Sequence, residues 1–207
     1  MGNIVNAAIT IKGTRPLFQH KFGPEALPLE KLEKTGVAGN DPEEWRKTAM
    51  VTRDGQLYLD PTYVFATIRD GAKYTKKGRG SIQTAVAATL QCNDDRILID
   101  RWMPDFPNGQ TCDLATVAVP PEDPEAPVYL DVRGVRNPST KARNVRYRVA
   151  ASKGWACTFN ILWDKTIVSR VQMEAVLIDA GNLIGIGNGR AIGMGRFEIM
   201  DFTVSDS

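Results

Sequence analysis

The sequence has few of the residues that metal sites and disulfide frameworks require. Its 207 residues include three cysteines and one histidine. Cys92, Cys112 and Cys157 lie far apart, are odd in number and form no Cys-x-x-Cys pair. Neither a disulfide framework nor a zinc site is therefore expected. We expect no metal and no cofactor, and this cysteine usage fits a reducing cytoplasm.

Long hydrophobic runs are also lacking. About 18 consecutive apolar residues would be needed for a membrane-spanning helix, and no such run occurs. The first residues do not place a basic segment before an apolar one, as a signal peptide does. We therefore expect a cytoplasmic protein with no membrane partner. Hydrophobic residues make up 43% of the chain and charged residues 24%, which is typical of one globular domain with an elaboration.

The net charge of the chain is also small. The chain has 26 Lys and Arg against 24 Asp and Glu, a net charge of +2. Taken alone, this balance argues against a nucleic-acid binder, which usually carries a basic surface. The charges are segregated, however, because residues 69–79 and 133–153 together carry twelve basic residues and one acid. Such segments suit phosphate binding, although they also fit two solvated loops whose charge aids solubility.

Alternation, capping residues and turn residues predict six firm elements. Ser169 and Gln172 have capping-box spacing at the start of one helix, and Asp60-Pro61 opens the other. The order is βαββαβ, so the expected fold class is α+β, a ferredoxin-like or RRM-like palm with a large inserted lobe. A bulge is expected in the last strand. The predicted elements are strands 3–12, 128–135, 155–163 and 196–204 and helices 61–74 and 169–183.

The densest motif is a glycine-rich segment, residues 185–197, with sequence GIGNGRAIGMGRF. Glycines allow positive φ and close backbone approach, and amides exposed in such a loop can hold phosphates. The dinucleotide-binding fingerprint does not apply, because that motif follows a strand and opens a helix, whereas this one follows a helix. The Walker motif is excluded for lack of Gly-Lys-Ser/Thr. A loop of purely structural glycines is the alternative interpretation.

The spacing Gly185-x-Gly187 followed by Gly193-x-Gly195 resembles the glycine-rich loop of the RAMP superfamily, the RNA-binding proteins of CRISPR effector complexes. The first strand and residues 13–17 (GTRPL) are similar to the opening of the backbone, crRNA-binding subunits. Residues 60–70 are similar to their helix with a proline start and a central arginine. The resemblance covers roughly two-thirds of the chain, and residues 82–127 match no recognised pattern.

The resemblance implies one RAMP-like domain over residues 1–207, with an elaboration at 13–60 and an inserted lobe at 75–127. It implies head-to-tail assembly with further copies along single-stranded RNA or DNA, RNA first and a guide RNA among the candidates. It also implies effector-complex subunits as partners and a role in antiviral defence. Subunits of this family that cut RNA carry an aspartate after the first strand, but residues 14–24 contain no acid. Cutting by that route is not expected.

The predicted nucleic-acid site combines the basic segments, the glycine-rich loop and one aromatic side chain. Tyr147 stands among arginines in the sequence and is expected to stack on a base. No catalytic and no metal-binding residue is assigned. The predicted binding residues are Arg15, His20, Lys21, Arg69, Lys73, Lys76, Lys77, Arg79, Arg136, Lys141, Arg143, Arg146, Tyr147, Arg148, Gly187, Arg190, Gly193 and Arg196.

Two alternatives remain open. His20, the single histidine, follows the first strand and would be the general base of a metal-independent endoribonuclease. The sequence shows no partner that would orient it. The other alternative is a virion or scaffold protein that binds no nucleic acid and whose basic loops match an acidic partner.

Overall fold

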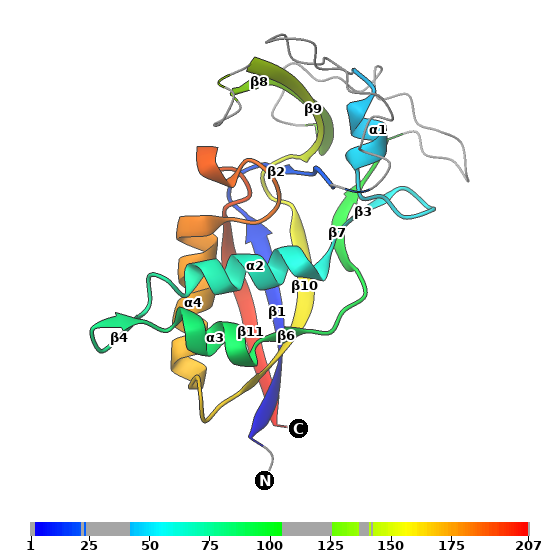
Figure 1. Ribbon diagram of the computed structural model, residues 1–207. Helices are drawn as coiled ribbons and strands as arrows, with labels where there is room; N and C mark the ends of the chain where they lie inside the picture. Colours follow the sequence, from blue (N-terminus) through cyan, green and yellow to red (C-terminus); the bar gives the residue numbers. More distant parts are fainter. Residues whose placement is uncertain are drawn as a thin grey trace. The chain divides into compact units, whose positions relative to one another are not determined.

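The computed structural model describes residues 3–21, 23, 42–104, 126–136, 141 and 143–206, and Figure 1 shows its elements. Most of the proline-rich stretch 120–127 and of the predicted lobe 75–127 beyond residue 104 lies outside the described residues. The chain divides into two compact units. Unit 1 comprises Met1–Leu17, Tyr58–Asp100 and Lys153–Ser207, and unit 2 comprises Phe18–Leu57 and Arg101–Ser152.

Unit 1 is built on an antiparallel sheet. Strand β1 (Ile4–Gly13) lies between β10 (Ala156–Asp164) and β11 (Phe197–Asp206) and is antiparallel to both. The strand order is β11-β1-β10-β7-β3, and the short strand β6 (Gln91–Cys92) also pairs with β10. Strands β3 (Gln56–Leu59) and β7 (Ile97–Trp102) cross the boundary between the units in sequence. Strand β11 forms one end of this order.

Three helices cover one face of this sheet: α2 (Pro61–Gly71), α3 (Gln83–Thr89) and α4 (Arg170–Asp179) (Figure 1). Asp60 caps α2 by accepting from the Thr62 amide, and Pro61 needs no amide partner at the first turn. Ser169 and Gln172 form both bonds of a capping box at the start of α4, as the sequence predicts. One π-helical turn, Ala180–Ile184, continues α4 toward the glycine-rich segment.

The core of unit 1 follows from strand alternation. Val5, Ala7, Ile9 and Ile11 of β1 are at most 2% exposed, and each is paired with an equally apolar position on β10. Burial of each large aliphatic side chain contributes about 1.5–3 kcal/mol. The intervening positions of β1, β10 and β11 form the other face of the sheet. These are Ile4, Asn6, Ala8, Thr10, Lys12, Ala156, Thr158, Asn160, Leu162, Asp164, Glu198, Asp201, Thr203 and Ser205, none of them aromatic.

Strand β11 contains the predicted bulge. Ile11 pairs with Ile199 and Thr10 pairs with Asp201, so Met200 is the extra residue. Because the bulge shifts the alternation by one position, Ile199 and Phe202 both lie on the helix-covered face, where Phe202 stacks on Trp163 at 6.2 Å between ring centroids.

Unit 2 contains a three-stranded sheet in the order β2-β9-β8. Strands β8 (Val128–Arg136) and β9 (Arg143–Ala151) form a long antiparallel ribbon, and β2 (Leu17–Phe18) pairs with β9. The short helix α1 (Glu44–Thr48) packs against β9. Its Trp45 is 5% exposed, and the Arg46 guanidinium lies over that ring.

The structure confirms an α+β fold and five of the six predicted elements in their places, with helix 61–74 ending at Gly71. The predicted strand 128–135 also forms, as β8, but its expected place in the central sheet is wrong. It pairs with β9 in unit 2, and β7 takes the position beside β10. Alternation identifies a strand but not its neighbour, because partner choice depends on long-range packing. Within the described part of the chain, no helix is long and apolar enough to span a membrane.

Candidate nucleic-acid interface

The glycine-rich segment of unit 1 forms a loop whose two ends cross at van der Waals distance. The Ile186 amide donates to Gly195 O at 2.9 Å, and a Cβ on Gly195 would lie 1.8 Å from Ile186 O. A Cβ on Gly185 would lie 2.6 Å from Met194 O, and both glycines have positive φ. These two glycines are therefore required by packing. The structural-glycine interpretation holds for this part of the motif.

The tip of the loop differs from its base. Gly193 has φ +79° and nothing within 4 Å of a Cβ position, and Gly187 and Gly189 also have positive φ. A short 3-10 turn, Arg190–Ile192, lies between the left-handed residues Gly189 and Gly193. The positive φ angles turn the tip back on itself, and the amides of Ile192, Gly193 and Met194 donate to carbonyls of Gly189 and Arg190 within the turn. The empty space at Gly193 still leaves its main chain accessible to a ligand.

Two neighbouring segments hold this loop. The Thr67 hydroxyl on α2 donates to Gly185 O at 3.1 Å. The Gly195 amide donates to Pro16 O at 2.8 Å, and the Thr14 amide donates to Arg196 O at 2.8 Å. The turn after β1 and the C-terminal half of α2 therefore meet at the glycine-rich loop. We call residues 13–16, 67–73 and 185–196 the glycine-loop cluster.

Asp70 gathers the cations of this cluster. Its carboxylate lies 3.1 Å from Arg69 Nη2, 3.2 Å from Lys73 Nζ and 3.5 Å from Arg190 Nη1. Burial raises the pKa of Asp70, but hydrogen bonds from Lys73 and Arg69 outweigh it and the net pKa lies below the usual value. The three cations are 41%, 52% and 37% exposed, so one acid positions three accessible positive charges beside the loop.

In unit 2, the basic residues of the ribbon are divided between its two faces. Arg133 pairs with Arg146 and Asp131 pairs with Arg148 across the strands, which places these four side chains on one face. Val132 pairs with Tyr147 and Arg136 with Arg143, on the opposite face. The group Val132, Tyr147, Arg136 and Arg143 is called the outer ribbon face below.

The other face, which carries Asp131, Arg133, Arg146 and Arg148 and is called the inner ribbon face, is occupied by ion pairs. Asp131, 4% exposed, binds both Arg133 and Arg148, and Arg148 is itself 3% exposed. Both guanidinium carbons lie over the Phe18 ring, at 4.8 Å and 4.9 Å from its centroid. Burial lowers the pKa of Arg148, and the charge of Asp131 opposes that shift. These arginines stabilise the ribbon through desolvated pairs and cation–π contacts.

Glu44 of α1 forms a second ion pair on the inner ribbon face, with Arg146. Its carboxylate binds Arg146, accepts from the Tyr147 amide at 3.3 Å and lies 3.1 Å from His20 Nε2. The His20 side chain is 16% exposed and that of Glu44 15%. The sequence shows no partner for His20. In the structure that partner is the carboxylate of Glu44, which orients the imidazole.

The outer ribbon face is accessible. Arg136 and Arg143 are exposed, Val132 is 49% exposed and Tyr147 is half-buried. One aromatic ring therefore lies on the same face as two arginines that belong to adjacent strands. An aromatic ring beside cations is the combination that binds single strands, because bases stack on the ring and phosphates meet the cations.

Comparison with known proteins adds little. No family model and no curated protein matches the sequence. The chain is similar to one chain of a solved structure described as the cryo-EM structure of the type III-B Cmr-beta bound to cognate target RNA. The identity is 11% and the TM-score 0.42, over 97% of this chain and 60% of that chain. This chain thus spans about three-fifths of that neighbour, and a TM-score this low carries no functional argument.

The predicted site residues do not form one site but fall into separate groups. Arg15, Arg69, Lys73, Arg190 and Arg196 belong to the glycine-loop cluster with Gly187 and Gly193. Lys76, Lys77 and Arg79 are exposed on a separate hairpin of β4 (Lys76–Lys77) and β5 (Gly80–Ser81). Arg136, Arg143 and Tyr147 lie on the outer ribbon face, with Arg146 and Arg148 on the inner one. Lys21 and Lys141 are exposed, and Lys141 has φ 59°.

The site residues that sequence reasoning missed are the carboxylates Asp70, Glu44 and Asp131. Asp70 and Lys73 have the i, i+3 spacing of a helical ion pair, so that pair was detectable. Glu44 and Arg146 are 102 residues apart and no local pattern connects them. Cys92 and Cys157 are excluded as nucleophiles, because burial raises the pKa of each thiol to about 12.

Proposed function

We propose that this protein binds single-stranded nucleic acid without sequence preference, with RNA as the first candidate. The observation that carries the proposal is the outer ribbon face, where Tyr147 shares one accessible face of the ribbon with Arg136 and Arg143, four residues along the strands. Bases would stack on Tyr147, and the two guanidiniums would neutralise phosphates further along the same strand. Because stacking and phosphate contacts read no base edge, binding would not depend on sequence.

The glycine-loop cluster would supply a second contact to the backbone. Arg69, Lys73 and Arg190 converge on Asp70, which leaves that group with a net positive charge beside the open loop tip. Gly193 and Gly187 would allow a phosphate to approach the main chain. The uncovered face of the central sheet bears no aromatic side chain on β1, β10 or β11, so stacking on the sheet itself is not part of the proposal.

The wider part of the proposal concerns assembly. Copies would associate head-to-tail along the strand, in the manner of a RAMP backbone subunit with a ferredoxin-like palm, together with other subunits of an effector complex. The order β11-β1-β10-β7 of antiparallel strands under helices α2 and α4 is compatible with such a palm. A guide RNA would then be the bound strand.

Fluorescence anisotropy with labelled oligonucleotides tests the proposal. The dissociation constant is measured for RNA and DNA homopolymers and mixed sequences at several salt concentrations. We expect tight binding at low salt that weakens as salt rises, with little difference between sequences. The variant Arg136→Ala/Arg143→Ala should make the log–log salt slope shallower by about 1.4, or about 0.7 per lost phosphate contact.

Arg53→Ala is the matched control, because Arg53 is an exposed arginine of unit 2 outside the predicted set. It should retain the slope of the unmodified protein. Absence of binding to any single strand at low salt would overturn the proposal and leave the scaffold interpretation, in which the basic surfaces match an acidic protein.

A second function is favoured by one contact. His20 Nε2 lies 3.1 Å from Glu44 Oε1, the arrangement in which a carboxylate orients an imidazole that serves as a general base. A metal-independent endoribonuclease would use this pair, with Arg146 beside it on Glu44. The test is cleavage of labelled RNA in the presence of a chelator. Loss of cleavage in His20→Ala supports this function, and intact RNA with the unmodified protein excludes it.

A further inference from the structure

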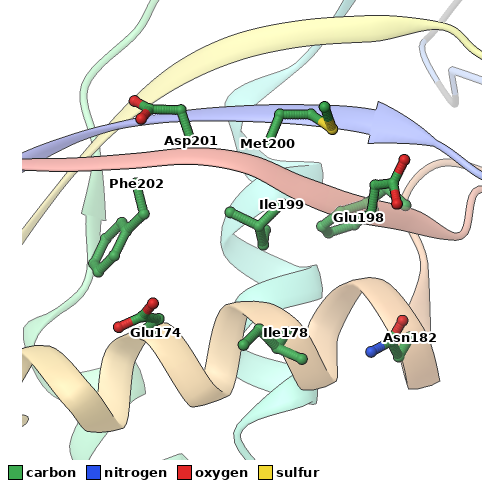
Figure 2. A pocket seen from close by; sticks show the side chains of 9 residues that line it. Glu174, Ile178, Asn182, Glu198, Ile199, Met200, Asp201 and Phe202 are labelled. Carbon is green, nitrogen blue, oxygen red and sulfur yellow. The ribbon is translucent and has the colours of Figure 1, made fainter.

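The outer edge of β11 is a surface without a described partner strand. Strand β11 ends the strand order of the central sheet, so one side of its backbone pairs with no other strand within the described residues. A groove of about 450 Å³ runs between this strand and α4, lined by Glu174, Ile178, Asn182 and residues 197–202. Figure 2 shows Ile199 and Phe202 directed from the strand toward the helix.

This edge is both apolar and acidic. Val171 and Ile178, one heptad apart on α4, are 75% and 46% exposed, and Met200 at the bulge is 56% exposed. Exposed side chains of this size in one region indicate an interaction surface. Glu174 faces the groove from α4, while Glu198 and Asp201 lie on the far side of β11 (Figure 2).

Acidic side chains outnumber cations around this edge. Glu174, Glu198 and Asp201 are all exposed. Two described cations lie nearby: Arg170, whose guanidinium carbon lies 5.8 Å from the Phe202 ring centroid, and exposed Lys12, which is the cross-strand partner of Glu198. Three acids against these two cations leave the edge net negative by one charge, so a basic segment is the occupant that its charge favours.

The same unit carries such a segment. The β4–β5 hairpin projects from the helix layer as a separate two-stranded sheet, and its Lys76, Lys77 and Arg79 are all exposed (Figure 1). Its root is held by the Thr75 hydroxyl, which donates to the Asp179 carboxylate on α4 at 2.9 Å. Gly78 takes φ +61° at the turn, with nothing within 4 Å of a Cβ position. The hairpin is therefore anchored at its base and open at its tip.

We propose that the β4–β5 hairpin of one copy docks on the β11 edge of a second copy. Lys76 and Lys77 would face Glu198 and Asp201, and the short hairpin strand would add to one side of the bulge by main-chain hydrogen bonds. The bulge at Met200 limits the paired length, which suits a hairpin whose strands have two residues each. Apolar contact with Ile178 and Met200 would complete the interface.

The contact joins two different surfaces of the same chain, so every copy offers one hairpin and one edge. Such a heterologous contact can be repeated from copy to copy. It supplies the surfaces for the self-association in the proposed function, on which this inference rests. It also assigns the hairpin lysines a protein partner rather than a phosphate.

Charge reversal tests the contact. Variant Lys76→Glu/Lys77→Glu has an acidic hairpin and an acidic edge, and variant Glu198→Lys/Asp201→Lys has a basic hairpin and a basic edge. Each alone should sediment as a 22.8 kDa monomer without nucleic acid. An equimolar mixture restores both opposite-charge contacts and should associate as the unmodified protein does. Association should weaken as salt rises.

Asp95→Lys is the control, since Asp95 is an exposed acid of unit 1 near β7, on the other side of β1 and β10 from β11. It should associate normally. Circular dichroism confirms that all variants are folded. An unmodified protein that stays monomeric, single variants that still associate, or a mixture that does not would each overturn the inference.

Oligonucleotide anisotropy, run separately on the unmodified protein, distinguishes this failure from failure of the proposed function. Binding of single strands by a protein that stays monomeric overturns only the docking contact. Self-association that follows the charge-reversal pattern, without nucleic-acid binding, overturns only the nucleic-acid proposal.

Discussion

Arg148 and Asp131 form a buried ion pair in which both side chains are less than 5% exposed. Arg133 shares the same carboxylate, and both guanidiniums lie over Phe18. Arg148, one of the predicted nucleic-acid contacts, is thus held on a buried face of the ribbon by an acid seventeen residues earlier. This relationship makes the ribbon sensitive to loss of a single carboxylate.

Asp131→Ala should lower the free energy of unfolding by about 3–5 kcal/mol, because the Arg148 charge would remain buried without its partner. Urea denaturation followed by circular dichroism measures the change. Replacing both partners, Asp131→Leu/Arg148→Met, should recover most of the loss. Asp95→Ala, at an exposed acid, should change stability by no more than about 0.5 kcal/mol. A loss of less than 1 kcal/mol for Asp131→Ala would contradict the buried-pair account.

Gly195→Ala should destabilise the protein by about 2–4 kcal/mol, because a methyl group would collide with Ile186 O and the backbone would stay at positive φ. Gly193→Ala is the matched comparison, since its φ is also positive but its Cβ position is empty. It should cost only about 1–2 kcal/mol. Thermal unfolding of the two variants separates steric collision from backbone strain, and equal losses would show that packing at the crossing plays no part.

Asp70 should make stability depend on acid pH. Its pKa is lowered in the folded protein, although burial alone would raise it, because Lys73 and Arg69 donate hydrogen bonds to the charged form. The contribution is complete above the unfolded value near 3.8 and is lost as pH falls through the lower folded value. The difference in urea midpoint between the unmodified protein and Asp70→Asn should therefore shrink below about pH 4. A constant difference at every pH would exclude this linkage.

Tyr147→Ala should weaken single-strand binding by about 1–3 kcal/mol, or roughly 5- to 150-fold, if its ring stacks on a base. Tyr147→Phe keeps the ring and should bind nearly as the unmodified protein does. The salt slope should stay the same in both variants, because no phosphate contact is removed. Anisotropy titrations measure all three quantities, and equal affinities for the two variants would remove stacking from the mechanism.

Local features of the fold were predictable from sequence, whereas partners far along the chain were not. The capping box of Ser169 and Gln172 and the bulge at Met200 follow from patterns only a few residues long. The register that separates Tyr147 from Arg148 follows from alternation once β9 is known, but the density of basic residues in 141–153 indicates a charge cluster and hides the strand. Asp131 reaches Arg148 from the paired strand and Glu44 reaches Arg146 from α1, and both contacts depend on which distant segments pair or pack together.

The glycine-rich loop contains both a feature that was predictable from sequence and one that was not. Spacing identified the loop, and positive φ at Gly193 agrees with the conformational freedom expected of it. That Gly195 and Ile186 approach each other closely enough to exclude a methyl group depends on how two ends of a loop cross. Periodicity describes a single element, whereas this crossing is a property of two segments folded together.

The chain enters and leaves the second unit twice, since unit 2 consists of residues 18–57 and 101–152 inserted into unit 1. Neither unit is therefore a continuous stretch of polypeptide. Cutting the backbone at one boundary would leave both units tethered by the remaining connections. A gene fragment ending after residue 57 or residue 100 would encode part of each unit and the whole of neither, whereas one ending after residue 152 would encode all of unit 2 and only part of unit 1. To express unit 1 alone, residues 18–57 and 101–152 would both have to be removed and replaced by linkers. Unit 1 would then be joined from three separate segments.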